Sequence, residues 1–550
     1  MKSWAASRAA EGAAALLLMS LFLAWSAHRI SHPGLHSDEM LFATPALEAG
    51  GATYDPWFHL PLMVGGYLGA LKAYLFMPIF AVVDPGPAVI RGPSVLLAGA
   101  ALLGFWLFLR WIAGRGAALL MLALIVLDPS YTFAARVDWG PTVLMQVFKA
   151  AALLALFQLV EQGRPGRLWL LALIALLGLY DKLNFIWVMN ALALGALAAH
   201  GRRLLELAYT QPRRFWPPAV VLGVATGAVF VYAIVGLLPE THPQQAGMTP
   251  LQRLGFTLSV IARTFDGTWI HQWIVLQPIG RWPVALALHA LLLAAVGVVV
   301  ASRRRTWSAS ETRLLRWLVF CVVAEVGVVA QLAATRAFWG AHHALVLWPF
   351  PQAAAALAVT LAWRRMSGTA TVRCALIAAT AGAAAVILAG QVRAAVAYER
   401  DIYGVSSTPN ALFTPEIYEL SRFLDPRLPR VASVITADWG LRYPLRVLAE
   451  AGQRDKIRDF WAVFRDYGRG EGRTLYKEWF EGRSVIVVSY LPQRRVFADS
   501  DENWRRFLQK HLEPRGGVRR TTLGSYEIVC VAPDSSADEL CGTFGGSRRK

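Results

Sequence analysis

The sequence predicts a mostly α-helical membrane protein: a polytopic bundle of transmembrane helices followed by an extracytoplasmic α/β domain. Of its 550 residues 56% are hydrophobic and only 16% are charged, whereas soluble domains carry about 25% charged residues. The apolar residues form blocks of roughly 16–25, the length that crosses a hydrocarbon layer about 30 Å thick. The mean hydropathy, +0.43, is positive over the whole chain. This composition excludes a disordered chain, a fibre and an ordinary soluble enzyme.

Eleven apolar blocks are predicted to span the membrane as helices. They cover residues 10–28, 92–112, 117–133, 140–160, 168–182, 185–200, 217–238, 282–301, 315–334, 345–362 and 374–394. The end of the first block lacks a good small-x-small cleavage site, so a spanning helix is favoured over a cleaved signal peptide.

The charges in the connecting segments predict the topology. Segments assigned to the inner side hold 18 Lys/Arg and four acids, whereas the longer outer segments hold nine Lys/Arg and ten acids. This asymmetry places the N-terminus in the cytoplasm and, with an odd number of helices, the C-terminus outside. The net charge of +18 therefore reflects topology and contact with anionic lipid, and no nucleic-acid partner is expected. The Ala- and Arg-rich composition suggests the inner membrane of a bacterium.

Two segments outside the spans are assigned separately. The first outer loop, 29–91, contains an apolar stretch, 58–83, that we interpret as interfacial helices, because a crossing there would invert every later loop. Residues 395–550 carry 25 Lys/Arg and 21 acids, which predicts a periplasmic α/β domain after a membrane domain of residues 1–394. Strands are expected at Ala432–Thr436, Ser484–Ser489 and Tyr526–Val531. Cys530 and Cys541 either form a disulfide or stay unpaired.

Unusual polar residues gather on the predicted outer side. The pair Asp38-Glu39 follows the first span by about ten residues, and either a helix cap or a general base would explain it. Arg136 and Asp138 connect two later spans, and Asp181-Lys182 separates two spans with hardly any loop. Such charges must lie at the interface or in a wet cavity, although each set also has a purely structural interpretation.

Three further groups extend the candidate site. His342 and His343 precede the tenth span, and Tyr67 lies in the interfacial stretch; all three are candidates for substrate binding. A divalent metal held by His32, His36 and other outer histidines stays open, but satisfied interfacial histidines are favoured, and neither a metal ligand nor a cofactor is assigned. Within the bilayer, Lys149 and Glu325 must face protein or water, and they could pair with each other.

The order of these features resembles the GT-C glycosyltransferases, specifically the superfamily of protein mannosyltransferases and aminoarabinose transferases. The resemblance rests on Asp38-Glu39, on the Pro-Leu…Gly-Ala-Leu-Lys pattern of the interfacial segment, on Arg91-Gly-Pro-Ser at the start of the second span, and on the Arg136/Asp138 loop. It covers residues 10–240 well, and the later helices match in topology only. The chain has Leu60-Pro61-Leu62 where the family often has Pro-Pro-Leu.

The resemblance implies a sugar donor on a polyprenyl phosphate and a glycan, lipid or protein acceptor. Asp38 then matches the catalytic base, with Glu39 beside it, and Asp138 matches an acid that assists binding. The leaving phosphate needs cations, for which Arg91, Arg136 and Lys182 are the outer candidates. Asp181, His342, His343 and Tyr67 are expected to bind substrate. A direct displacement would invert the anomeric carbon without a metal or a covalent intermediate.

Two alternatives come from other classes of protein. A lipid or sugar transporter, or flippase, would need inverted repeats and polar residues at mid-membrane. A non-catalytic relative would bind a partner through its outer domain, and Asp38, Arg136 and Asp138 would then not converge.

Overall fold

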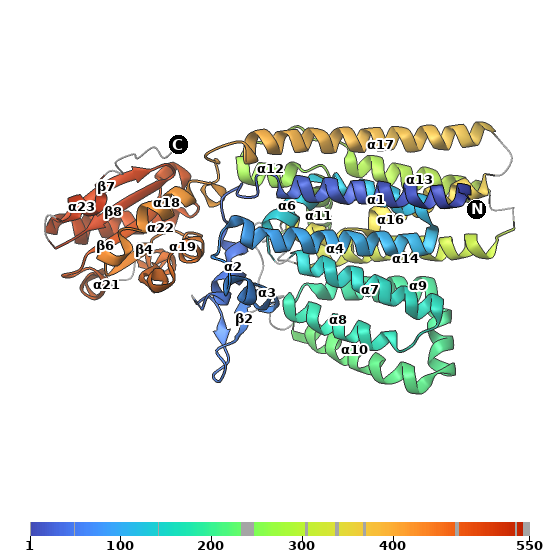
Figure 1. The fold of residues 1–550 in the computed structure, drawn as a ribbon, viewed down its shortest axis with the longest axis horizontal. Helices are drawn as coiled ribbons and strands as arrows, with labels where there is room; N and C mark the ends of the chain where they lie inside the picture. Colours follow the sequence, from blue (N-terminus) through green and yellow to red (C-terminus); the bar gives the residue numbers. More distant parts are fainter. Residues whose placement is uncertain are drawn as a thin grey trace.

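The fold was analysed in a computed structural model, which describes residues 2–48, 50–65, 67–140, 142–232, 247–302, 306–335, 340–366, 370–467, 472–533 and 536–542. The molecule is elongated, with long helices along its axis and a sheet domain at one end (Figure 1). The N-terminus lies at the other end of the helices.

The apolar blocks form long helices because a backbone in lipid must satisfy its own hydrogen bonds. Each predicted span falls on helical segments, but 117–133 is broken at residues 127–128 and 345–362 at residues 348–349. The seventh, 217–238, runs beyond the described residues after 232. Seven described helices are long and apolar enough to cross a membrane, or eight if the bent pair α5–α6 is one span. The helices of this part are α1 (Lys2–Ala27), α4 (Pro87–Ala113), α5 (Arg115–Val126), α6 (Pro129–Val137), α7 (Thr142–Gln162), α8 (Arg167–Asp181), α9 (Phe185–Thr210), α10 (Pro212–Tyr232), α13 (Val284–Ala301), α14 (Ala309–Ala334), α15 (Ala341–Ala344), α16 (Phe350–Arg365) and α17 (Ala370–Tyr398).

The two buried charges inside the bundle do not pair with each other. The Lys149 ammonium donates to the carbonyls of Val346 and Trp348, whereas Glu325 lies 2.7 Å from the His289 ring. The suggested Lys149–Glu325 pair is therefore wrong. Each charge is satisfied locally, as an ionised group at membrane depth must be.

The first outer loop folds as α2 (Ser37–Ala46), three short strands and α3 (Leu71–Phe80). The strands β1 (Thr53–Tyr54), β2 (Pro61–Gly65) and β3 (Leu68–Gly69) form an antiparallel sheet. The expectation of helices throughout 58–83 is therefore wrong for its first half. A helix of ten residues is about 15 Å long and too short to cross the hydrocarbon layer. Two more short helices, α11 (Pro250–Phe265) and α12 (Thr268–Val275), lie at this same end of the bundle (Figure 1).

The C-terminal domain is a five-stranded mixed sheet in the order β5-β4-β6-β8-β7. The three predicted strands are confirmed as β4 (Ser433–Thr436), β6 (Val485–Tyr490) and β8 (Tyr526–Val531), and the structure adds β5 (Ile457–Asp459) and β7 (Val518–Leu523). Strands β4, β5 and β6 are parallel, whereas β8 is antiparallel to both neighbours. The helices of this domain are α18 (Ile417–Leu424), α19 (Arg442–Leu448), α20 (Trp461–Arg465), α21 (Gly472–Trp479), α22 (Ala498–Phe507) and α23 (Ala537–Cys541).

Both faces of this sheet are covered. Along β6, Ile486 and Val488 enter one hydrophobic core, whereas Val485 and Val487 enter another. The first core also contains Phe133 from α6 and residues of α12 and α17. The sheet domain therefore packs directly on one end of the helical part.

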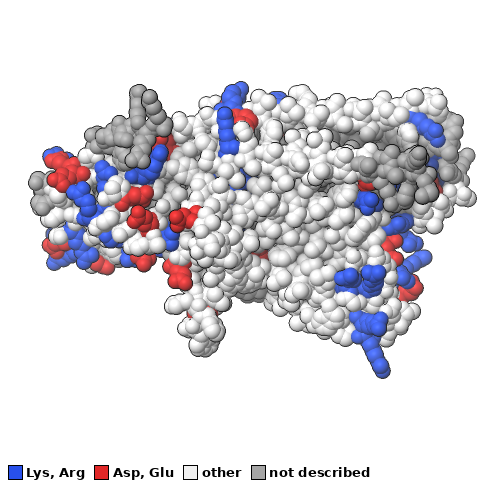
Figure 2. Space-filling model, viewed as in Figure 1, with Lys and Arg blue, Asp and Glu red and all other residues white. Residues whose placement is uncertain are grey.

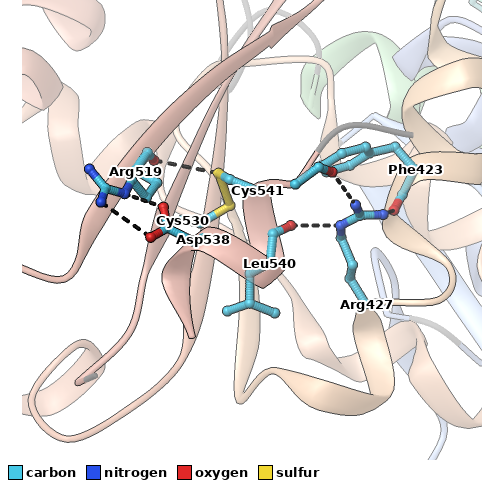
Figure 3. Close-up of a disulfide and its surroundings, with 8 residues drawn as sticks. Phe423, Arg427, Arg519, Cys530, Asp538, Leu540 and Cys541 are labelled. Atoms are coloured by element: carbon cyan, nitrogen blue, oxygen red, sulfur yellow. Dashed lines mark hydrogen bonds and ion pairs between the residues drawn. A yellow bond between two sulfur atoms is a disulfide. The ribbon is translucent and has the colours of Figure 1, made fainter. Parts of the chain in front are cut away.

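A disulfide ties the end of the described chain to the sheet. Cys530 of β8 is bonded to Cys541 of α23, and the guanidinium of Arg427 donates to the Leu540 carbonyl at 2.6 Å (Figure 3). Asp538 pairs with Arg519 on the neighbouring strand. The sequence did not decide between paired and unpaired cysteines, and the structure contains the disulfide.

The charged side chains on the surface are unevenly distributed. On the face shown in Figure 2 they crowd the sheet domain and the opposite ends of the helices, with a broad uncharged zone between. A zone of this kind suits a hydrocarbon layer.

Candidate active site

The candidate site begins where α2 starts, at the end of the helical part nearest the sheet domain. His36 is the N-cap: its ring Nδ1 accepts a hydrogen bond from the Asp38 amide at 3.1 Å. The Glu39 carboxylate accepts one from the His36 amide in return, which completes a capping box. Burial lowers the pKa of His36, so its ring is neutral and can accept. The helix-cap interpretation of Asp38 is therefore wrong, and its carboxylate stays half-buried.

Glu39 and Arg91 form a closed structural unit. The two make a bidentate pair, with Arg91 Nη2 2.8 Å from Glu39 Oε2, and both side chains are almost fully buried. Arg91 also donates to the carbonyls of Ile30, Pro33 and Gly34. All its nitrogens are thus occupied, and its guanidinium ties the first outer loop to α4. This geometry corrects two predictions: Glu39 is not free to act as a base, and Arg91 is not free to bind a phosphate.

Arg136 is also directed away from the site. Its guanidinium donates to the carbonyls of Trp25, Ser26 and His32 at the end of α1. It also lies over the Tyr403 ring, 3.7 Å from the centroid. The predicted phosphate-binding role does not fit this placement, because the guanidinium instead caps the C-terminal carbonyls of a helix.

Asp138 occupies the bend between α6 and α7. It has a left-handed backbone, with φ of 47°, which directs the chain from one helix into the next. Its Oδ1 accepts from the amides of Thr142 and Val143 at 2.9 and 2.8 Å. Its Oδ2 pairs with the Nζ of Lys72 from α3 at 2.5 Å, and both side chains are only 2% exposed. Asp138 therefore holds a buried cation and the start of α7 together.

Of the three predicted phosphate-binding residues, Lys182 is the one that lies near the acidic residues Asp38, Asp138 and Asp181. Residues Leu68 and Lys182 form an isolated β-bridge, which fixes the small sheet against the end of α8. The contact is close, since a Cβ on Gly69 would lie 2.2 Å from the Tyr180 carbonyl oxygen. The ammonium lies 3.3 Å from the Gly140 carbonyl, and its charge interacts with those of Asp138, Asp181 and Asp38.

Asp181 is fully buried, and neither carboxylate oxygen has a hydrogen-bond partner within the described chain. The side-chain amide of Asn184, one turn further on, is likewise without a partner there. Buried polar atoms are nearly always satisfied, so unsatisfied ones beside charged groups indicate a place where a polar ligand can bind.

Aromatic rings surround the Asp38 carboxylate. Trp139 Nε1 donates to Asp38 Oδ2 at 3.1 Å. The same indole lies 4.9 Å from the His342 ring, and His342 lies 4.1 Å from His343. The Tyr67 side chain is 49% exposed at the turn between β2 and β3, and its carbonyl accepts from the Leu183 amide. Both histidines therefore belong to the site, whereas the backbone of Tyr67 is hydrogen-bonded to Leu183, the residue after Lys182.

The sheet domain closes the other side of the site. Trp439, which follows β4, lies 6.3 Å from the His36 ring and 6.1 Å from the Phe497 ring. Its neighbour Asp438 accepts from the Tyr490 amide, and burial raises the pKa of Asp438 to about 7. Asp438 and Trp439 follow the carboxyl end of the parallel strand β4, and ligands of α/β sheets bind at this edge.

The assembled cluster thus contains Asp38, Asp138, Asp181, Lys182, His342 and His343, and excludes Glu39, Arg91 and Arg136. The sequence interpretation missed Lys72 as a site residue. One signal was available: it is the lone charged residue in an apolar stretch, and such a charge must be paired. Among the described residues, no group of three or more His, Cys, Asp or Glu side chains is arranged to hold a metal ion.

The comparisons with known proteins concern the fold. No family model and no curated protein matches the sequence. The structure of ArnT from Cupriavidus metallidurans in the apo state is similar over 96% of this chain and 99% of that chain, with a TM-score of 0.55 and 12% identity. Two structures of the Archaeoglobus fulgidus oligosaccharyltransferase, one tethered to an acceptor peptide and one with an inhibitory peptide and dolichol-phosphate, have TM-scores of 0.43 and identities of 13% and 14%. They cover 93% of this chain and 73% and 74% of their own. At this identity the likeness to ArnT concerns the fold alone, and it confirms the predicted helical bundle with a C-terminal α/β domain.

Proposed function

We propose that this chain is a membrane glycosyltransferase that moves a sugar from a polyprenyl-phosphate donor to an acceptor hydroxyl at the outer membrane surface. The observation that carries the proposal is a cluster at one end of the helices. The half-buried Asp38 carboxylate and Asp138 both interact with the charge of the buried Lys182 ammonium, and Asp138 also pairs with the buried Lys72 ammonium. A carboxylate base close to two cations suits the transfer of a group from a phosphate leaving group to a hydroxyl. The GT-C-like fold is consistent with this chemistry but does not establish it.

Asp38 is proposed as the base. It lies at the start of α2, and among the described side chains only Trp139 donates a hydrogen bond to it, at Oδ2. The indole fixes the carboxylate and leaves Oδ1 for the acceptor hydroxyl. Glu39 next to it cannot do the same, because Arg91 and the His36 amide occupy its oxygens.

The proposed reaction is a single direct displacement that uses no cofactor. The acceptor oxygen attacks the anomeric carbon while its proton passes to Asp38. The bond between the anomeric carbon and the phosphate oxygen breaks, and the polyprenyl phosphate leaves with the electron pair. Lys72 and Lys182 would stabilise the negative charge on that phosphate as it develops. The single displacement inverts the anomeric centre, and the proton on Asp38 then passes to water.

The unsatisfied Asp181 and Asn184 side chains are proposed to bind hydroxyl or amino groups of the donor sugar, with His342 and His343 at the rim. The Trp439 loop of the sheet domain is proposed to border the acceptor. We place the protein in a bacterial inner membrane, with this end outside. That topology rests on the Lys/Arg asymmetry of the loops.

The test is Asp38→Asn in purified protein, with release of polyprenyl phosphate measured over a panel of polyprenyl-phosphate hexoses and pentoses. Loss of a general base should lower the rate by about 10²–10⁴-fold. The matched control is Glu48→Gln, an exposed acid on the same loop, which should keep full activity. Retention of activity by folded Asp38→Asn would refute the base assignment. Movement of labelled lipid across proteoliposomes without sugar transfer would support a transporter instead.

A further inference from the structure

A second site lies at the far end of the helices, away from the cluster around Asp38. The loop between α7 and α8 and the junction of α9 with α10 enclose an open cavity of about 470 Å³. Its lining includes three arginines, an indole and an amide side chain: Arg164, Arg213, Arg214, Trp169 and Gln211. Figure 2 shows basic side chains gathered at this end of the molecule.

No carboxylate of the described chain compensates the positive charge of this cavity. Within the described residues, no ion pair joins Arg164, Arg213 or Arg214 to a carboxylate, and all three side chains are exposed. The two nearby acids are already used: Glu161 pairs with Arg313, and Glu206 pairs with Arg203. The cavity therefore presents three free guanidinium groups, whose planar forks suit the oxygens of a phosphate.

The surface next to the cavity suits acyl chains. Helices α8 and α10 pack against each other, and each presents an exposed apolar stripe that starts at the cavity. On α8 the stripe contains Leu170 and Leu173, which are 36% and 52% exposed. On α10 it contains Val220 and Val224, at 56% and 66%. These stripes lie along helices of the membrane bundle, where exposed leucine and valine face lipid.

The indoles mark the boundary between the two environments. Trp169 at the cavity and Trp216 on the first turns of α10 are 50% and 53% exposed. Tryptophan concentrates at the headgroup level of a membrane, because its ring is apolar and its N–H is polar.

We infer that this cavity binds the headgroup of an anionic phospholipid, with the phosphate between Arg164, Arg213 and Arg214 and the acyl chains along α8 and α10. A soluble phosphate compound would use the arginines but would leave the apolar stripes without a role. The polyprenyl carrier of the proposed reaction is expected at the opposite end. The cavity is therefore a distinct lipid site, independent of sugar transfer.

The experiment compares lipid binding by the full chain and two variants in detergent. Delipidated protein is mixed with dioleoylphosphatidylglycerol or dioleoylphosphatidylcholine, and bound lipid is counted by native mass spectrometry. Arg164→Gln/Arg213→Gln removes one charge from each loop of the cavity. The control, Arg202→Gln/Arg316→Gln, removes two exposed arginines of the same end that do not line the cavity.

Wild type and control should bind phosphatidylglycerol in preference to phosphatidylcholine. The cavity variant should lose about tenfold in phosphatidylglycerol affinity, since each lost guanidinium removes charge-assisted hydrogen bonds. Equal losses in both variants would overturn the proposal, because the effect would then come from net charge. Full displacement of the lipid by inorganic phosphate, or tight binding of phosphate alone, would also overturn it, since the site would then recognise a soluble anion.

Discussion

The buried pair of Lys72 and Asp138 gives the sharpest test of the site's construction. We consider Lys72→Met, Asp138→Asn and the double variant. Methionine keeps most of the lysine's volume between the rings of Phe42 and Phe76, which lie 5.5 and 5.3 Å from Nζ. Asparagine keeps one oxygen to accept from the amides at the start of α7.

The expected costs follow from what each single variant leaves behind. In Asp138→Asn the Lys72 ammonium stays buried without a counter-charge, and breaking a buried pair in this way costs about 3 kcal/mol or more. In Lys72→Met the carboxylate keeps its two backbone donors, so the cost should be nearer 2 kcal/mol. The double variant removes both charges and keeps the cap, and should also lie within about 2 kcal/mol of wild type. The two substitutions are therefore expected to be non-additive by about 3 kcal/mol.

The assay is equilibrium unfolding in mixed micelles, with the free energy of unfolding compared across the four proteins. Costs that add to within about 0.5 kcal/mol would refute the argument, because they would show that the two charges do not interact. Sugar transfer, measured on the same proteins, separates stability from chemistry. The double variant should regain stability without regaining transfer, since the proposed reaction needs the Lys72 cation.

Three further predictions concern other parts of the fold. Because the pKa of Asp438 is raised to about 7 from 3.8, the stability it contributes is fully present below pH 4 and is lost as the pH rises through 7. Asp438→Asn should abolish this fall, at most about 4 kcal/mol, in a pH series of unfolding. Cys530→Ala/Cys541→Ala should destabilise the sheet domain by about 3 kcal/mol, as expected for a loop of 11 residues; an unchanged denaturation midpoint would argue against the bridge. Gly69→Ala should lower transfer in folded protein, because its Cβ would meet the Tyr180 carbonyl at 2.2 Å and displace the end of α8; unchanged kinetics would separate that contact from the site.

Much of the fold could be predicted from the sequence, because residues that are buried or face lipid form recognisable runs of apolar side chains. Helices in lipid must be continuous apolar blocks, and every predicted span falls on helical segments where the structure describes it, although short turns break 117–133 and 345–362. Strands β4 and β6 are buried on both faces and contain no charged residue, so they stand out as short, mostly apolar runs. Edge strand β7 has no buried residue and contains the exposed Arg519 and Arg520, so its pattern was too weak to recognise. The first half of 58–83 was misassigned because its hydrophobicity is typical of both strands and interfacial helices.

The sequence alone determined that acids and bases would gather at one end of a helical membrane protein, because their positions between apolar blocks fix their depth. Tertiary structure decided which of them face one another. The adjacent residues Asp38 and Glu39 have different partners. At the start of α2 the side chain of Asp38 is directed toward Trp139, whereas that of Glu39 is directed toward Arg91. Asp138 pairs with Lys72, which lies 66 positions earlier in the chain. Side-chain direction and pairing across such distances depend on how helices pack, and local sequence does not encode that packing.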